Sequence, residues 1–272
     1  QLPLWKEIGI NRISVGVQSL KDPVLKKLNR HQSAKDVYTL LERAQGVFDN
    51  VSVDLILGLP EVSEDDWRAL LREVVTWPIK HLSMYFLTVH EDTPLYFKVK
   101  TAAVTLPTDD TMVDLYYWSI DFLAQHGFEQ YEISNFAREG RRSRHNSMYW
   151  ERKPYKAFGL GACSFDGSVR FQNEKNLMKY IAGAPAGNAV SFAEELTRKQ
   201  IHMEKIMLGV RRMQGVELDE VMRALTCEEK EKIQYQIAQL KNRNLVREAD
   251  GRLVLTPAGL AVENAIAEQL SL

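Results

Sequence analysis

The chain has 272 residues, and its 35 lysines and arginines against 36 aspartates and glutamates give a formal net charge of −1. This balance excludes a protein that coats nucleic acid through a generally basic surface. Hydrophobic residues make up 45% of the chain and charged residues 26%, which excludes a disordered or collagen-like protein and is typical of a soluble globular one.

The first half of the chain alternates apolar, β-branched segments with helical patterns. Strands are expected at 12–18, 51–57 and 81–88, and helices at about 34–47 and 63–76. This strand–helix–strand order predicts a parallel sheet. A serine followed three residues later by an aspartate stands at the start of each helix, which is the pattern of a side chain that caps exposed N–H groups.

The rest of the chain is predicted to be more varied. Between 89 and 173 we expect an extended loop over 89–106, a helix over 108–126, a short strand over 129–134 and an irregular stretch over 135–173. The last eighty or so residues are expected to contain helices at about 192–212, 217–223 and 228–242, short strands at 245–248 and 252–255, and a final helix from Pro257. Helices followed by a two-stranded wing predict a winged-helix-like module.

Charge bears on what this last module does. Residues 196–272 contain 12 basic and 11 acidic side chains, whereas a module that reads a DNA groove should present a basic face. A small packing domain is therefore favoured over a DNA-binding regulator, and no nucleic-acid partner is expected.

The two faces of the predicted strands differ in polarity. Side chains two apart in a strand share a face, and in all three strands one face is apolar while the other is more polar, with Gly16, Gln18 and Asp54 among its residues. If the apolar faces meet the helices, the polar faces point into the interior of a curved sheet. A buried carboxylate needs a partner. For Asp54 the alternatives are an ion pair with Arg12 or Arg30, or the ammonium or hydroxyl groups of a ligand.

The remaining signals concern cysteines and targeting. Cys163 and Cys227 lie far apart and outside any metal-ligand spacing, so neither a disulfide framework nor a metal site is predicted from them. No apolar run approaches the ~18 residues of a membrane span, and no signal-peptide pattern opens the chain. We expect a cytoplasmic protein, and the sequence gives no support for membrane association.

A series of short motifs carries a family resemblance over nearly the whole chain. The sequence resembles the later two-thirds of the radical S-adenosylmethionine (SAM) proteins related to oxygen-independent coproporphyrinogen III oxidase, most closely the HemW-type haem chaperones. The matching stretches, in the family's order, are GVQS (16–19), LNRHQS (28–33), VDLILGLP (53–60), EDTPLY (91–96), YEISNFA (131–137), HNSMYW (145–150), GLGACS (159–164) and LGVRRMQGVEL (208–218).

This resemblance implies an α/β fold, in which a partial TIM-like (β/α) radical SAM barrel is followed by a small helical, winged-helix-like C-terminal domain. The expected division is a partial barrel over 1–134, an irregular family-specific extension over 135–190 and a HemN-type winged-helix-like domain over 191–272.

The same resemblance implies a SAM site inside the barrel. Its family positions correspond to Gln18, Arg30 and Asp54, and the first and last of these already share the predicted polar face. Leu87 and Thr88, at the end of the third strand, are weaker candidates for the edge of the cofactor. Without the family, Arg30 would be interpreted as a solvated charge in a loop.

The segment HNSMYW favours the haem chaperones over the oxidase. The imidazole of His145 is a suitable haem ligand, and Tyr149 and Trp150 offer flat faces to a macrocycle. Residues 138–156 hold seven basic and two acidic side chains, which suits the propionates of haem or another tetrapyrrole. The alternative is a basic surface loop with an aromatic anchor. The other histidines are predicted to be structural or exposed: His31, His81, His90, His126 and His202.

The family's cluster-binding motif is not present in this sequence. Radical SAM proteins hold a [4Fe–4S] cluster with three cysteines in a C-x3-C-x2-C loop, and the chain is expected to begin after that loop, as part of a longer protein. We therefore expect the chain by itself not to cleave SAM, and Cys163 departs from the histidine that the family often has there. The expected function is haem binding and transfer to acceptor proteins, and the alternative is oxidative decarboxylation of coproporphyrinogen III to protoporphyrinogen IX.

Overall fold

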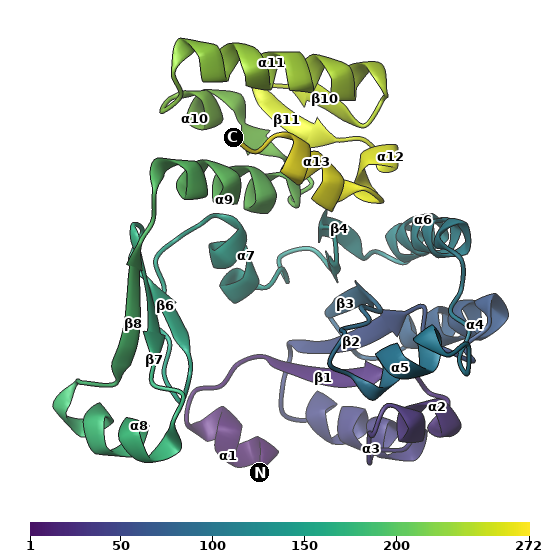
Figure 1. Cartoon of the computed structure of the whole chain (residues 1–272). Helices are drawn as coiled ribbons and strands as arrows, with labels where there is room; N and C mark the ends of the chain where they lie inside the picture. Colours follow the sequence, from purple (N-terminus) through teal and green to yellow (C-terminus); the bar gives the residue numbers. More distant parts are fainter. The chain divides into compact units, whose positions relative to one another are not determined.

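The predicted strand–helix–strand order is present as three parallel strands, β1 (Ile13–Gln18), β2 (Val51–Leu57) and β3 (His81–Phe86). They belong to a computed structural model that describes residues 1–272 (Figure 1). By its internal contacts the chain divides into two units, Gln1–Arg142 and Ser143–Leu272. The boundary falls inside the segment 135–190, whose standing as a separate extension remains a prediction.

Helices flank this sheet in the first unit. They are α1 (Leu2–Glu7), α2 (Asp22–Lys27), α3 (Ala34–Gln45), α4 (Glu64–Val74), α5 (Pro94–Lys100) and α6 (Asp109–Gln125). The capping boxes predicted for α3 and α4 are both formed, Ser33 with Asp36 and Ser63 with Asp66. The helix α5 was not predicted, although Thr93 caps its first turn and Pro94 occupies a position at which proline is favoured.

Two short antiparallel strands complete the sheet. The strand predicted over 129–134 ends early and turns back on itself as β4 (Glu129–Glu132) and β5 (Asn135–Ala137). The strand order is β1-β2-β3-β5-β4, with β5 antiparallel to β3.

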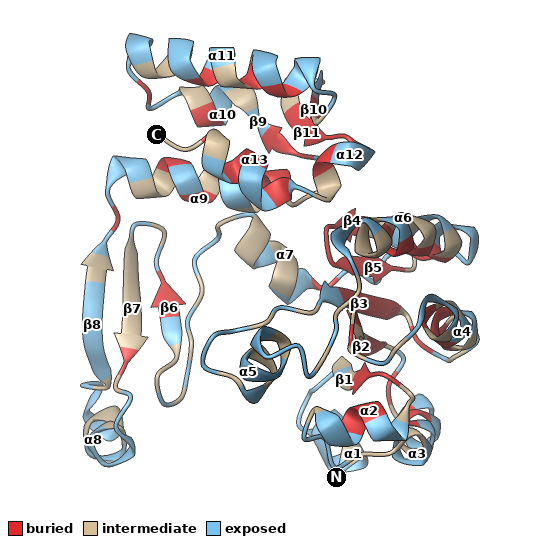
Figure 2. Cartoon of the chain, turned by 45° about the vertical axis from the view of Figure 1, so that its right-hand side comes forward, coloured by how far each residue is buried: buried red, intermediate tan, exposed pale blue.

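The apolar faces of the parallel strands form the core of the first unit, as the alternation predicts. Val17, Val53, Leu55, Leu82 and Met84 are all at most 2% exposed. Figure 2 shows the buried positions concentrated in these strands and on the inner sides of the surrounding helices. The opposite face, with Ser14, Asp54 and Ser83, is therefore left for polar contacts.

The second unit begins with elements that the sequence did not predict. The stretch expected to be irregular contains α7 (Arg144–Trp150), β6 (Cys163–Phe165) and β7 (Val169–Asn173), and it is followed by α8 (Leu177–Gly183) and a 3-10 turn, η1 (Ala184–Ala186). Strands β6 and β7 form an antiparallel sheet with β8 (Val190–Glu195). These elements are three to seven residues long, too short for a clear period.

The helix expected from residue 192 begins later. Residues 192–195 belong to β8, and α9 (Arg198–Val210) starts where Thr197 and Gln200 form a capping box.

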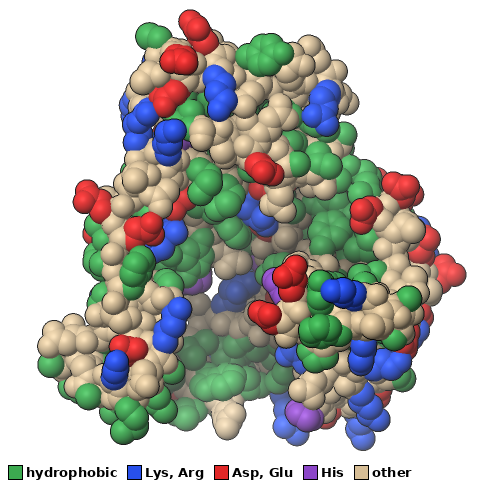
Figure 3. Space-filling model, viewed as in Figure 1, with side chains coloured by type: hydrophobic (Ala, Val, Ile, Leu, Met, Phe, Trp, Pro, Cys, Tyr) green, Lys and Arg blue, Asp and Glu red, His purple; other side chains and the backbone are tan.

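Apolar side chains remain on the surface of α8, beside the sheet of β6, β7 and β8. Leu177, Met178 and Ile181 are at least 56% exposed, and hydrophobic atoms gather at that place in Figure 3.

The remainder of the second unit has the predicted winged-helix-like order. Its elements are β9 (Val216–Glu217), α10 (Leu218–Met222), α11 (Cys227–Asn242), β10 (Val246–Ala249), β11 (Arg252–Leu255), α12 (Pro257–Leu260) and α13 (Glu263–Gln269). The predicted two-stranded wing gains a third strand, in the order β10-β11-β9. No helix in the structure combines the length and the apolar character that a membrane span requires.

Candidate functional site

Asp54 stands on the polar face of the parallel sheet, between Gly16 of β1 and Ser83 of β3 in the strand register. Its Oδ1 accepts a hydrogen bond of 3.0 Å from the hydroxyl of Ser14. No ion pair joins it to Arg12 or Arg30. Of the two alternatives for Asp54, the internal ion pair is therefore not formed, and its charge remains available to a ligand.

Gln18 ends β1 on the same side of the sheet. The register of β1 against β2 shifts between Gly16 and Gln18, and Gln18 has a left-handed backbone with φ of 64°. Its side chain lies over Gly16: a Cβ added at Gly16 would come within 2.9 Å of the Gln18 Nε2. Gln18 is 9% exposed.

Arg30 is exposed, in the loop that joins α2 to α3. Gln32 belongs to the LNRHQS motif but was not among the predicted site residues. It ties this loop to the end of β1 through a hydrogen bond of 2.6 Å from its Nε2 to the carbonyl of Gly16. The loop that carries Arg30 is thus anchored next to Gln18. Leu87 is half-buried and Thr88 exposed beyond the end of β3.

A buried hydrogen-bonded network continues the polar face of the sheet. The hydroxyl of Ser83 donates to Asn135 Oδ1 at 2.8 Å, and Asn135 in turn donates to the buried carboxylate of Glu132.

His81 is fully buried, and burial lowers its pKa to about 3. This histidine, like the buried His202, fits the predicted structural role, while His31, His90 and His126 are exposed.

In the second unit, α7 carries the residues expected to bind haem. Ser143 caps this helix by accepting from the backbone N–H of Asn146, and the spacing of four places His145 and Tyr149 on one face. Their ring centroids lie 4.8 Å apart in an edge-to-face arrangement. His145 is exposed, whereas Tyr149 and Trp150 are half-buried, and the guanidinium of Arg211 lies 4.9 Å from the ring of Trp150.

The basic stretch 138–156 is not a single free patch. Arg138 donates to the carbonyl of His126 and lies over the ring of Phe128, and Arg142 pairs with Glu129 at 3.6 Å. Arg152 pairs with Glu204 and Lys153 with Glu151. Four of the seven basic side chains are thus engaged within the protein. The partners of Arg138, Arg142 and Arg152 lie outside the counted stretch, where a count over 138–156 could not reveal them.

The structure offers no set of side chains for an iron–sulfur cluster. Cys163 and Cys227 are both free and exposed, and no three histidine, cysteine, aspartate or glutamate side chains are grouped as metal ligands would be. A [4Fe–4S] cluster of this family needs three cysteines. The residues present do not fit this group, and no chemical step is assigned to it.

Comparison with known proteins agrees with these observations. A family model for the radical SAM superfamily matches residues 1–74. Proteins named heme chaperone HemW are similar along most of the chain: the one from Lactococcus lactis is 29% identical over 97% of the chain and 70% of its own length, and that from Bacillus subtilis is 34% identical over 79% of the chain and 58% of its own.

The chain belongs to the HemW- and HemN-like radical SAM family. A HemW from Synechocystis is also 34% identical, over 79% of the chain and 53% of its own length, so that the chain spans 53 to 70% of these three relatives. The solved structure of coproporphyrinogen III oxidase (HemN) from Escherichia coli matches with a TM-score of 0.76 at 21% identity, covering 100% of this chain and 67% of that one. This likeness confirms the predicted α/β fold of the family.

Proposed function

We propose that this protein of the HemW- and HemN-like family binds haem and transfers it to acceptor proteins, as a haem chaperone. The observation that carries the proposal is the similarity to several proteins named HemW along most of the chain. The exposed imidazole of His145 supports it, because histidine is a common axial ligand of haem iron. Tyr149 and Trp150, on the same short helix, would contact the macrocycle through their ring faces.

We further propose that the polar face of the first unit holds SAM through Gln18, Arg30 and Asp54. The amide of Gln18 offers both donors and acceptors, and the Asp54 carboxylate, which accepts from Ser14 at one oxygen, can accept further from ammonium or hydroxyl groups. Arg30 is exposed on an anchored loop, where its guanidinium is accessible to a carboxylate. These three residues are proposed only to bind SAM.

A haem titration followed by absorbance tests the main proposal. We expect saturable binding of haem by the chain, weakened at least about tenfold in His145→Ala through loss of the iron ligand. His90→Ala is the matched control, because His90 is an exposed histidine of the first unit.

The outcomes separate the protein's function from the residue's role. Absence of saturable haem binding would contradict the chaperone proposal. Tight binding that is the same in His145→Ala would leave the chaperone proposal in place and show that another residue holds the iron.

A further inference from the structure

A cavity of about 350 Å³ opens in the second unit between α7, the β6–β7 hairpin and α9. Its apolar lining consists largely of rings and thioethers, from Tyr149, Trp150, Tyr155, Phe165, Met203 and Met207. This volume lies within the range of small-molecule sites. Met203 and Met207 are about 40% exposed, so the cavity is open to solvent on the side of α9. Such a lining suits a flat, apolar ligand.

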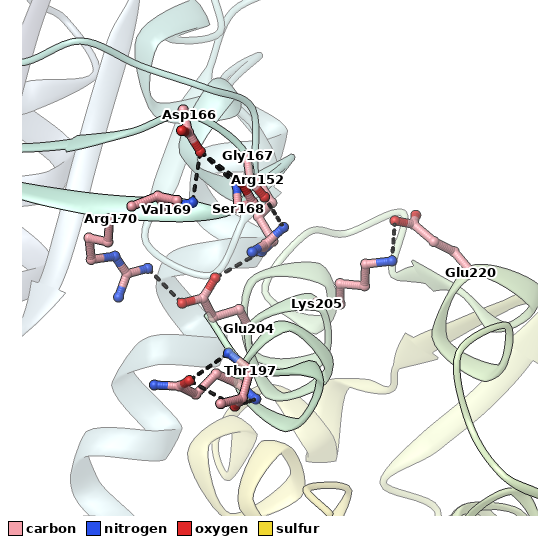
Figure 4. Close-up of polar contacts among 11 residues, drawn as sticks. Arg152, Asp166, Gly167, Ser168, Val169, Arg170, Thr197, Glu204, Lys205 and Glu220 are labelled. Carbon is pink, nitrogen blue, oxygen red and sulfur yellow. Dashed lines mark hydrogen bonds and ion pairs between the residues drawn. The ribbon is translucent and has the colours of Figure 1, made fainter. Parts of the chain in front are cut away.

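One wall of the cavity carries a cluster of three charges, shown in Figure 4. The side chain of Glu204, on α9, is 6% exposed and accepts from two arginines, at 2.8 Å from Arg152 Nε and at 2.6 Å from Arg170 Nη2. Arg152 follows α7 and Arg170 lies on β7, so three separate elements meet at this carboxylate. With two guanidiniums against one carboxylate, the cluster has an excess positive charge.

Two residues that line the cavity, Arg152 and Trp150, each carry a buried donor without a partner. Arg152 Nη1 donates to the carbonyl of Gly167, but its Nη2 is buried and has no partner. The indole Nε1 of Trp150 is likewise buried without a partner. Buried polar groups are nearly always bonded in native proteins, and these two can only donate. They call for an acceptor that this chain does not supply.

The side chain of Arg170 is the accessible part of the cluster. It is 41% exposed, and only its Nη2 bonds to Glu204, which leaves further N–H groups for a ligand. The neighbouring Lys153 is paired with Glu151 and is less available. Glu204 holds the guanidinium of Arg170 in a fixed orientation, as is needed for bidentate binding of a carboxylate.

We propose that this cavity binds a flat, apolar ligand that bears a carboxylate, and that Arg170 and Arg152 hold the carboxylate while Glu204 positions them. The inference rests on the proposed function, since the porphyrin with its propionates is such a ligand. It assigns the propionate to the Glu204 cluster instead of the exposed basic residues of 138–156.

A pair of iron-free porphyrins tests the inference, because imidazole ligation plays no part in their binding. The chain is titrated with protoporphyrin IX and with its dimethyl ester, which keeps the ring and lacks the carboxylates. We expect Arg170→Ala to weaken binding of protoporphyrin IX about tenfold or more and to leave the ester unchanged. Arg170→Lys should give an intermediate loss.

Arg170 is chosen because it is the exposed member of the cluster, and circular dichroism checks that the variant folds. Arg247→Ala, at an exposed arginine of β10, is the matched control and should bind both porphyrins as the unchanged chain does. Equal affinity of Arg170→Ala and the unchanged chain for protoporphyrin IX would overturn the inference. An equal loss for both porphyrins would also overturn it, because the arginine would then support the wall without binding the carboxylate.

The same titrations distinguish failure of the inference from failure of the proposed function. Haem that does not bind, while protoporphyrin IX binds through Arg170, would contradict the chaperone proposal and leave the cavity assigned. Haem that binds through His145, with no effect of Arg170→Ala on either porphyrin, would contradict the assignment of the cavity and leave the chaperone proposal in place.

Discussion

Ser52 and His81 meet across β2 and β3, with 2.8 Å between the serine Oγ and the histidine Nδ1. The other ring nitrogen of His81, Nε2, lies 2.8 Å from the hydroxyl of Tyr131. Both polar atoms of a fully buried imidazole are therefore satisfied without a carboxylate nearby to stabilise a positive charge. Burial, and then the charge of Arg12, lower the pKa of His81 to about 3.

This histidine should make the first unit sensitive to acid. In the unfolded chain the pKa of His81 is near 6.5, whereas in the folded chain it is about 3. Between these two pH values the unfolded state binds a proton at His81 and the folded state does not. The free energy of unfolding is therefore unaffected by the titration of His81 above pH 6.5. It falls as the pH drops from 6.5 to about 3, by up to about 1.4 kcal/mol per pH unit. In His81→Gln we expect a shallower decline of the free energy of unfolding, measured with urea between pH 7 and 4.

The control for this prediction is His90→Gln, since His90 is exposed. It should keep the pH dependence of the unchanged chain. A decline of the same steepness in His81→Gln would show that His81 becomes charged in the folded protein.

Asp54 should contribute directly to SAM affinity. We expect Asp54→Asn to weaken binding of SAM by about tenfold or more, because a hydrogen bond to a charged group contributes roughly 1.5–3 kcal/mol. Ser14→Ala should have a smaller effect, since Ser14 only orients the carboxylate. Calorimetric titration measures both, with Asp65→Asn, an exposed aspartate of α4, as the control. Unchanged affinity in Asp54→Asn would remove this residue from the proposed site.

This chain of 272 residues should not cleave SAM reductively. Its two cysteines are exposed and isolated, and no group of metal-binding side chains is formed. After anaerobic reconstitution with iron and sulfide, we expect no 5′-deoxyadenosine by chromatography. The double variant Cys163→Ser, Cys227→Ser should behave identically. Production of 5′-deoxyadenosine that depends on either cysteine would refute the prediction.

Arg198 and Glu229 join the start of α9 to the start of α11. The guanidinium donates to both carboxylate oxygens, at 2.5 and 2.6 Å, and the backbone N–H of Thr226 also donates to the carboxylate. These hydrogen bonds, the one from Arg198 first, lower the pKa of Glu229 to about 2. In Arg198→Ala we expect the pKa of Glu229 to rise towards 4.5, followed by NMR titration. Arg223→Ala, at an exposed arginine nearby in the sequence, should leave it unchanged. A pKa that stays near 2 would mean that the helix start alone is responsible.

The local elements of the first unit could be predicted because their causes are local. Alternation placed Gly16 and Asp54 on one face, and the register of β1 and β2 pairs these two residues. The capping boxes at Ser33 and Ser63 act over three residues and formed as expected. Several of the motifs that indicated the family also lie in the first unit, among them GVQS in β1 and VDLILGLP in β2.

The sequence by itself therefore determined the parallel strands, the long capped helices and the family. Tertiary structure decided the short elements, α5, β5 and α7, whose three to seven residues are too few for a sequence period to predict. It also decided which charges are free. Glu204 meets Arg152 and Arg170 from 52 and 34 residues away, and no local pattern carries information about such a contact. The cavity beside this cluster exists only because the fold brings those three segments together.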